Sequence, residues 1–377
     1  MTQIHYLDHA ATAPVLPVCA QAVNAAMERF YNPSSQYSPA KEAARALEDD
    51  RRTMATALGC QPEEVIFTSG GTEGDNWALR WAEQKKQGHI ITTAIEHPAV
   101  LEGVKALAQK GFEVTYLPVD RDGHISVDDF QNALRPDTVL CSVMLVNNEL
   151  GSIQPVGQCC ALAKAYNKDI FFHTDAVQAF LKLPFSVRDL GVDALTVSGH
   201  KIGAPKGVGA LYLKKGSKLK PFILGGGQES GMRSGTESTA LIAGLAAAVR
   251  HGMTLGKGEW DRLKTLQSYA AEKLRAALPE LEVISQGECP HVLAVTLPGY
   301  KSEVVVRFLG DRGVCISSGS ACHKGKLSHV YAALGLPKPW LTGALRISFG
   351  PGSTAEDVDA LVDGLLAAQA VLFASMS

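Results

Sequence analysis

The sequence predicts an α/β protein with a large, mostly parallel sheet domain and a second, smaller α/β domain. Two patterns carry this prediction: short apolar runs alternate with amphipathic stretches between residues 60 and 215, and the pattern changes after Leu213. Strands that alternate with helices form parallel sheets whose faces the helices cover. With 377 residues, 46% of them hydrophobic, the chain is long enough to build two such cores.

Six short apolar runs are expected as strands of the first sheet: 65–68, 89–93, 112–117, 139–146, 170–175 and 194–198. The run VLCSVMLV at 139–146 is apolar without alternation, which is typical of a strand covered on both faces. Amphipathic spacing predicts the helices of this part of the chain at 40–58, 73–87, 99–110 and 156–166.

After Leu213, three glycines at 225–227 lead into an Ala-rich helix, 236–251, and a more polar helix, 259–278. Short strands then alternate with helices toward the C-terminus. We expect the strands at 282–284, 292–296 and 346–349, and the helices at 302–312 and 355–373. This order predicts the smaller α/β domain.

Charge and apolar segments exclude several classes of protein. Lys+Arg of 36 against Asp+Glu of 38 gives a net charge of −2 without long runs, which argues against a nucleic-acid or membrane-surface protein. No apolar stretch reaches the roughly 18 residues of a membrane-spanning helix, and residues 1–6 lack the pattern of a secretory signal. The eight cysteines form no CxxC pair, so neither zinc nor disulfides are expected, and a reducing cytoplasm is the predicted location.

The segment TSGGTE at 68–73 leads from a predicted strand through glycines into a helix. Backbone N–H groups and the helix dipole suit an anion there, most naturally a phosphate. A tight strand–helix turn capped by a threonine explains the same residues, so this cluster alone leaves both interpretations open. It is not a Walker loop, because no Gly-Lys-Ser/Thr follows.

Two further polar clusters, HTDAVQ at 173–178 and SGHK at 198–201, also follow predicted strands, where open α/β sheets bind their ligands. Alone, Asp175 and Lys201 are unremarkable loop residues. Together with an anion-binding turn they match the needs of pyridoxal phosphate: an amine for the aldehyde, a carboxylate for the ring nitrogen and donors for the phosphate. No metal site is expected, because the candidate histidines occur singly after different strands: His97, His173 and His200.

Motifs along almost the whole chain carry a family resemblance: YLDHAAT at 6–12, NPSS at 32–35, TSGGTE, EH at 96–97, VNNE at 146–149, HTDAVQ, SGHK, GGGQESGMRSGT at 225–236 and SSGSAC at 317–322. The sequence resembles the NifS/IscS-type cysteine desulfurases, a branch of the class V aminotransferase family of fold-type I pyridoxal-phosphate enzymes. The resemblance implies a large cofactor domain with a sheet of the seven-stranded type at 15–255. It implies a smaller domain built from 1–14 and 256–377.

The resemblance also implies how the cofactor would be held. Lys201 would bond to the aldehyde and then move protons, Asp175 would keep the ring nitrogen protonated, and His97 would stack on the ring. For His97, the alternative is a histidine at the start of a helix before Pro98. The other implied contacts are Gln178 to the phenolic oxygen with Asn148 beside it, and Gly71, Thr72, Ser198 and His200 to the phosphate, completed by Thr236 from the second subunit of a homodimer.

Arg346 matches the family's clamp for the substrate carboxylate, to which Asn32 would add a bond. Cys322 lies in a small-residue stretch whose neighbours include His323, Lys324 and Lys326, which would favour its thiolate. The resemblance therefore implies that L-cysteine becomes L-alanine while its sulfur stays on Cys322 as a persulfide. A sulfur-acceptor protein would then take that sulfur.

Other interpretations stay open on sequence alone. A selenocysteine lyase, or another pyridoxal-phosphate enzyme of the class V fold, would share these residues. A sulfur carrier that kept the fold but lost turnover is disfavoured, because all of the expected reactive side chains are present: Lys201, Asp175, His97, Arg346 and Cys322. The residues do not specify whether the sulfur goes to iron–sulfur cluster assembly, to tRNA thiolation or to a similar pathway.

Overall fold

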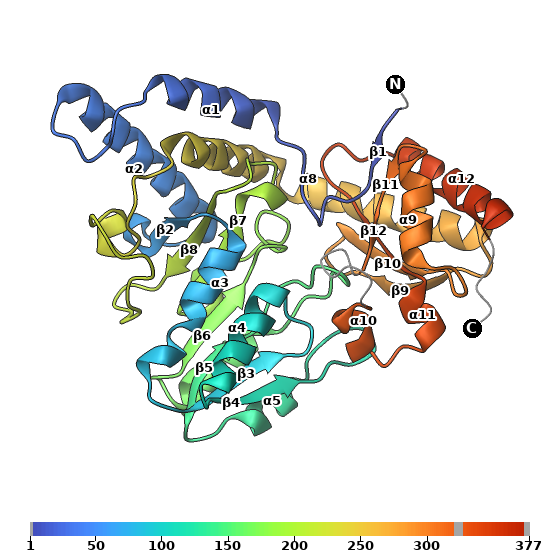
Figure 1. Cartoon of the computed structure of the whole chain (residues 1–377), viewed down its shortest axis with the longest axis horizontal. Helices are drawn as coiled ribbons and strands as arrows, with labels where there is room; N and C mark the ends of the chain where they lie inside the picture. The colour runs from blue at the N-terminus through green and yellow to red at the C-terminus, as the bar shows by residue number, and fades with distance from the viewer. Residues whose placement is uncertain (1–2, 320–326, 373–377) are drawn as a thin grey trace.

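The computed structural model describes residues 3–319 and 327–372. A seven-stranded sheet with the order β2-β8-β7-β6-β5-β3-β4 dominates it (Figure 1). The strands are β2 (Val65–Thr68), β3 (His89–Thr93), β4 (Glu113–Leu117), β5 (Thr138–Ser142), β6 (Phe171–Asp175), β7 (Ala194–Ser198) and β8 (Gly209–Leu213). Only β8 runs antiparallel to its neighbours in this sheet. The predicted mostly parallel α/β sheet is therefore confirmed.

Helices cover both faces of this sheet. One face carries α1 (Pro17–Glu28), α2 (Ser38–Leu58), α5 (Val127–Ala133), α6 (Val156–Tyr166), α7 (Val187–Leu190) and the first half of α8 (Thr239–Ala277), and the other carries α3 (Gly71–Leu79) and α4 (Pro98–Gln109). Side chains alternate between the two hydrophobic clusters, as the period of a strand requires. In β2, for example, Phe67 packs in the first cluster and Ile66 in the second.

Two predicted boundaries in this region were wrong, and one strand was missed. Strand β5 ends at Ser142, although the apolar run continues to Val146. Residues 143–146 are also buried, and the N–H groups of Val143 and Leu145 still donate to carbonyl oxygens of β6. Helix α3 ends at Leu79 and not at 87, since a 3₁₀ turn, Ala82–Gln84, buries Ala82 and prolongs the apolar spacing. The antiparallel strand β8 was not among the six expected runs.

The C-terminal part forms a smaller, antiparallel sheet. Its order is β12-β13-β10-β9, with β9 (Glu282–Gln286), β10 (Val292–Thr296), β12 (Ser317–Ser318) and β13 (Ala344–Ser348). Beside it lie α9 (Ser302–Gly310), α10 (His329–Ala333), α11 (Lys338–Thr342) and α12 (Ala355–Val371). The N-terminal β1 (His5–Tyr6) pairs with β11 (Val314–Cys315), and Leu7 packs in the hydrophobic cluster of this part. These contacts support the proposal that residues 1–14 belong to the smaller domain.

Helix α8 joins the two parts of the molecule, as Figure 1 shows. The sequence predicted two helices, 236–251 and 259–278, with a break between them. The structure confirms this break: the segment Thr239–Ala277 consists of two helices that meet at a kink at Gly256, whose φ of 53° and ψ of −149° are not helical. Glycine tolerates this backbone conformation, so the chain can kink there. Within the part of the chain that the structure describes, no helix is long and apolar enough to cross a membrane.

Candidate active site

A cavity of about 710 Å³ lies where the carboxyl ends of β6 and β7 meet the start of α3. Ten of the predicted site residues line it: Gly71, Thr72, His97, Asn148, Asp175, Gln178, Ser198, His200, Lys201 and Arg346. Segments far apart in the sequence contribute to its wall, including Ala10 and Ala11 near the N-terminus and Arg346 on β13. These ten residues therefore converge on one cavity between the two sheets.

Lys201 ends the short 3₁₀ turn Gly199–Lys201 that follows β7. Its Nζ donates hydrogen bonds to the carbonyl oxygens of Ala10 and Ala11, each at 2.7 Å. These bonds hold the amine at the cavity wall, and a compound with an aldehyde group could react with it there.

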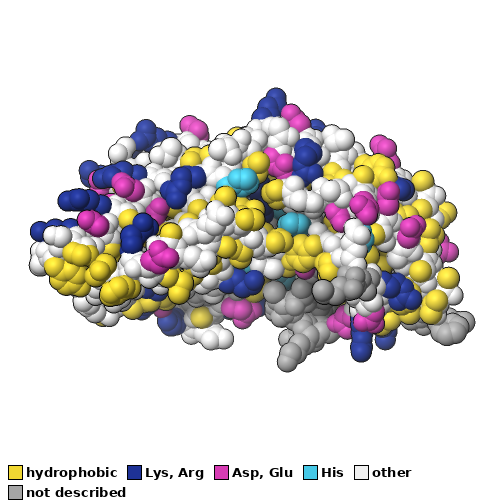
Figure 2. Space-filling model, turned by 90° about the horizontal axis from the view of Figure 1, so that it is seen from above, with side chains coloured by type: hydrophobic (Ala, Val, Ile, Leu, Met, Phe, Trp, Pro, Cys, Tyr) yellow, Lys and Arg dark blue, Asp and Glu magenta, His cyan; other side chains and the backbone are white. Residues whose placement is uncertain are grey.

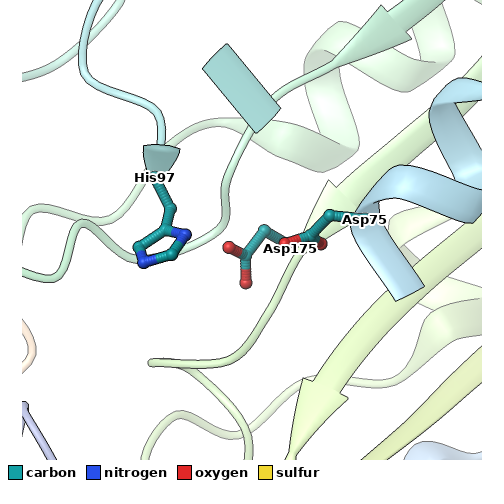
Figure 3. A group of neighbouring side chains, drawn as sticks. All are labelled: Asp75, His97 and Asp175. Atoms are coloured by element: carbon teal, nitrogen blue, oxygen red, sulfur yellow. The ribbon is translucent and has the colours of Figure 1, made fainter. Parts of the chain in front are cut away.

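Asp175 ends β6 with only 5% of its surface exposed. Its Oδ1 accepts a hydrogen bond from the backbone N–H of Val177 at 2.8 Å. Burial raises the pKa of Asp175, while the Val177 N–H and the nearby charge of Lys201 lower it. His97 points its ring toward this carboxylate in Figure 3. Burial first, and the charge of Lys201 second, lower the pKa of His97 to about 4, so its ring is neutral at pH 7.

The alternative interpretation of His97, a histidine at the start of a helix, is also confirmed. It is the N-cap of α4, and its Nδ1 accepts the N–H of Ala99 at 3.1 Å. The cap fixes the ring, and the same residue lines the cavity, so the two interpretations do not compete.

Asp75 is a buried carboxyl group that the sequence reasoning missed. It lies on α3, one turn after Thr72, and is 1% exposed. Burial first, and the charge of Asp175 second, raise the pKa of Asp75 well above its ordinary value. Two carboxylates side by side in a low dielectric do not both ionise. Asp175 has the N–H and lysine partners, so Asp75 keeps the proton and Asp175 the charge.

Asp75→Asn is expected to change the pH dependence of stability. An unfolded Asp ionises near pH 4, whereas native Asp75 keeps its proton to higher pH, so wild-type stability falls as pH rises through this window. Asparagine does not ionise, so the variant should gain about 1.4 kcal/mol over wild type per pH unit there. Urea unfolding at several pH values measures this difference. The exposed Asp261→Asn serves as the matched control, and a flat difference for Asp75→Asn would contradict the assignment.

Asp75, His97 and Asp175 also bring three possible metal-ligand atoms within 4.8 Å of one another (Figure 3). It is the one such group among residues 3–319 and 327–372. The sequence predicted no metal site, because spacing alone does not reveal ligands from α3, α4 and β6. The same cavity also presents a lysine amine and an anion-binding helix end, which are groups that a metal centre does not need.

The N-terminus of α3 lies at one end of the cavity. Gly70 has a φ of 153°, and a Cβ on Gly71 would lie 2.9 Å from Cγ2 of Val177, so glycine permits this close approach. The backbone N–H groups that begin the helix, together with Thr72, Ser198 and His200, can donate to a phosphate. The carboxylate of Glu73 accepts the N–H of Ser69 and pairs with Arg233 at 3.0 Å, so its charge has its own partners.

Arg346 lies on β13 and is 5% exposed. Its Nη2 donates to Oδ1 of Asp8 at 2.9 Å and its Nη1 to the carbonyl oxygen of Asn148 at 3.0 Å. Its Nε has no hydrogen-bond partner among the described residues, and neither does the side-chain oxygen of Asn148. A buried guanidinium with an unmet N–H in a cavity is suited to binding a carboxylate.

Three predicted residues are not placed in this cavity. Asn32 is exposed in the loop between α1 and α2, where its Oδ1 accepts the N–H of Ser34 at 2.9 Å. Thr236 is exposed before α8. Cys322 lies outside the described residues. The residues on either side of the undescribed segment, Gly319 and Leu327, both line the cavity.

An α/β fold that gathers a lysine, a buried carboxylate and a helix N-terminus around one cavity has the plan of a fold-type I pyridoxal-phosphate enzyme. The chain belongs to the class-V aminotransferase family, whose model matches residues 5–361. It is 40% identical over 370 residues to a cysteine desulfurase IscS of Clostridium botulinum (strain Kyoto / Type A2), covering 96% of this chain and 93% of the relative. It is 42% identical to the putative cysteine desulfurase IscS 1 of Bacillus subtilis, covering 94% and 95%.

Solved structures agree with this assignment. A structure titled NifS-like protein matches with a TM-score of 0.92 at 35% identity, covering 99% of this chain and all of the other. A structure titled SspA in complex with cysteine matches with a TM-score of 0.80 at 36% identity, covering 93% and 99%. The fold predicted from the resemblance is confirmed by these matches.

Proposed function

We propose that this chain is a pyridoxal-phosphate-dependent cysteine desulfurase that converts L-cysteine to L-alanine and passes the sulfur to an acceptor. The observation that carries the proposal is the meeting of Lys201, Asp175 and the α3 N-terminus around one cavity, with Arg346 opposite. The relatives named cysteine desulfurase point to the same substrate.

The wall of the cavity fits pyridoxal phosphate. The amine of Lys201 suits its aldehyde, the carboxylate of Asp175 suits a protonated ring nitrogen, and the donors at α3 suit its phosphate. When bound, this cofactor supplies an electron-accepting ring that makes the Cα proton of an amino acid acidic.

The protein's own groups would then handle protons and position the substrate. Lys201 would take the proton from Cα, because its amine is held at the cavity wall by two carbonyl oxygens. Asp175 would keep its charge and hold a proton on the ring nitrogen. His97, neutral and capped onto α4, would lie against the ring face and leave the carboxylate of Asp175 undisturbed.

Arg346 would bind the carboxylate of the substrate through N–H groups that Asp8 and Asn148 do not use. Arg346→Lys is therefore expected to lower kcat/KM for L-cysteine by roughly 100-fold, because one point charge replaces a two-bond fork. Alanine release against cysteine concentration measures the effect, and the absorbance of the bound cofactor should not change. The exposed Arg312→Lys serves as the matched control. Equal kcat/KM in the two variants would contradict the clamp.

Cys322 would accept the sulfur. It is three residues from Gly319, which lines the cavity, and three residues of chain reach at most roughly 10 Å. Its thiolate would form an S–S bond to the substrate sulfur while the C–S bond breaks. L-cysteine and the thiol of Cys322 would give L-alanine and a Cys322 persulfide, so the reaction is balanced without an added oxidant.

A second copy of the chain would complete the site. Hydrophobic side chains gather at the end of the molecule where the α1–α2 loop lies (Figures 1 and 2). Phe30 in that loop is 79% exposed and Leu224, before the segment of Thr236, is 82% exposed. Contact between two such surfaces would bury them and bring Thr236 to the phosphate end of the partner's cavity. Sedimentation analysis should give a dimer, and a monomer at micromolar concentration would count against this arrangement.

A comparison of substrates tests the proposed function. The purified protein should be yellow, release alanine from L-cysteine and retain labelled sulfur. Alanine released only from selenocysteine would favour the lyase, and a colourless protein without turnover would favour a sulfur carrier. A reducing cytoplasm is proposed on the seven described cysteines, all of which are free thiols.

A further inference from the structure

The side-chain amide of Gln178 has a fixed orientation. Its Nε2 donates to the carbonyl oxygen of Ala10 at 3.0 Å, and its Oε1 lies 3.2 Å from Nζ of Lys182 and 3.0 Å from Nε2 of His291. The carbonyl oxygen of Ala10 only accepts hydrogen bonds, so the amide nitrogen of Gln178 faces it. The amide oxygen therefore faces Lys182 and His291.

The protonation of His291 follows from the same contacts. Oε1 of Gln178 only accepts, so Nε2 of His291 carries the hydrogen. Burial lowers the pKa of this ring well below its ordinary value, so it is neutral and its Nδ1 is an acceptor. The Sγ of Cys289 lies 3.1 Å from that Nδ1, and burial raises the pKa of this thiol to about 12. The hydrogen bonds thus run in one direction, from Cys289 through His291 and Gln178 to Ala10.

The residues that lie behind the amide of Gln178 come from both parts of the molecule. Lys182 follows β6 in the large sheet, whereas Cys289 and His291 precede β10 in the smaller one. All three line a second, mostly apolar cavity of about 390 Å³, which Lys201 also borders. Gln178 lines the active-site cavity. Gln178 therefore lies between the active-site cavity and the donor groups of Lys182 and His291.

We propose that Lys182 and His291 are positioning residues that turn the oxygen of Gln178 away from the active site, so that its second N–H donates to an oxyanion bound there. The inference rests on the proposed function, in which that oxyanion is the phenolate of pyridoxal phosphate. A reversed amide would present an acceptor oxygen to the phenolate and repel it. Lys182 serves in either protonation state, since a neutral amine still has N–H groups to donate.

Two pairs of variants and one double variant test the proposal. Lys182→Met and His291→Phe each remove one donor to the oxygen of Gln178, whereas Lys182→Arg and His291→Gln each replace it with another donor. The double variant Lys182→Met/His291→Phe removes both donors. Pyridoxal phosphate is added to the cofactor-free chain, and its dissociation constant and visible spectrum are recorded. The double variant should bind it roughly tenfold more weakly, as expected for one lost hydrogen bond to a charged group. The absorption band of the bound cofactor should shift toward shorter wavelength, because a phenol absorbs at shorter wavelength than a phenolate.

The donor-keeping variants should stay within about twofold of wild type. Leu255→Met controls for packing, because Leu255 lines the second cavity and its apolar side chain forms no hydrogen bond. Identical spectra for the donor-removing and donor-keeping members of either pair would overturn the proposal, and each pair decides it alone if the double variant does not fold. A wild-type protein without a visible cofactor band would instead overturn the proposed function, and this inference with it.

Discussion

Lys201→Ala is expected to abolish alanine release from L-cysteine, with a loss of at least roughly 10⁴-fold, and to remove the visible band of the bound cofactor. The amine is the group that would bond to the aldehyde and then move the Cα proton. Its loss would remove both roles together. Borohydride treatment of the wild type should add the mass of the cofactor to the peptide that contains Lys201, and the variant should show no such addition.

Lys201→Arg separates this chemistry from a structural effect. In the structure the lysine amine also donates to the carbonyl oxygens of Ala10 and Ala11, so alanine removes this donor from both and leaves Ala10 with the bond from Gln178. Arginine keeps a cationic donor for them, but a guanidinium that stays protonated does not condense with an aldehyde. Both variants should therefore be inactive, whereas the exposed control Lys206→Ala should be active. An unchanged visible band in either Lys201 variant would contradict the assignment.

The sequence was sufficient to predict the fold class and the centre of the site. Asp175 and Lys201 follow apolar runs, and the carboxyl ends of neighbouring parallel strands lie side by side, so their approach could be expected. The glycines at 70 and 71 marked the close approach of a helix N-terminus in the same way. These signals are local, because each one lies within a few consecutive residues of the sequence.

Other features depend on contacts that a local pattern does not contain. Apolar character reports burial, and residues 143–146 are buried without being strand, so the end of β5 was missed. Asp75 looks like an ordinary polar helix residue until β6 brings Asp175 beside it. Asn32 and Thr236 are exposed and do not line the cavity of this chain, so their predicted roles stay predictions.

The cysteines show what structure adds to a count. In each of the seven described cysteines, burial raises the pKa of the thiol above its ordinary value, and four of these values lie near or above 11: Cys60, Cys159 and Cys289 at about 12, and Cys160 at about 11. A thiol of this kind is protonated at pH 7 and is a poor nucleophile. Cys322 stands apart in sequence, because His323, Lys324 and Lys326 supply positive charge beside it.

Cys322→Ser is expected to stop alanine release while leaving the cofactor in place. A serine hydroxyl does not ionise near neutral pH, so nothing attacks the substrate sulfur, although Lys201, Asp175 and Arg346 still bind cofactor and substrate. Added L-cysteine should therefore change the visible spectrum of the variant without release of alanine. With sulfur-labelled cysteine, label should remain on the wild-type protein after gel filtration and be released by a thiol reductant.

Cys60→Ser and Cys315→Ser are the matched controls, because these two are the partly exposed members of the described cysteines. Both should keep turnover and label, since the carboxylates Glu64 and Asp8 add to the effect of burial and keep their thiols protonated. Loss of label in either control would mean that the substituted cysteine, and not Cys322, accepts the sulfur. Undiminished turnover in Cys322→Ser would mean that sulfur leaves the substrate without a protein thiol, which a lyase could do and the proposed desulfurase could not.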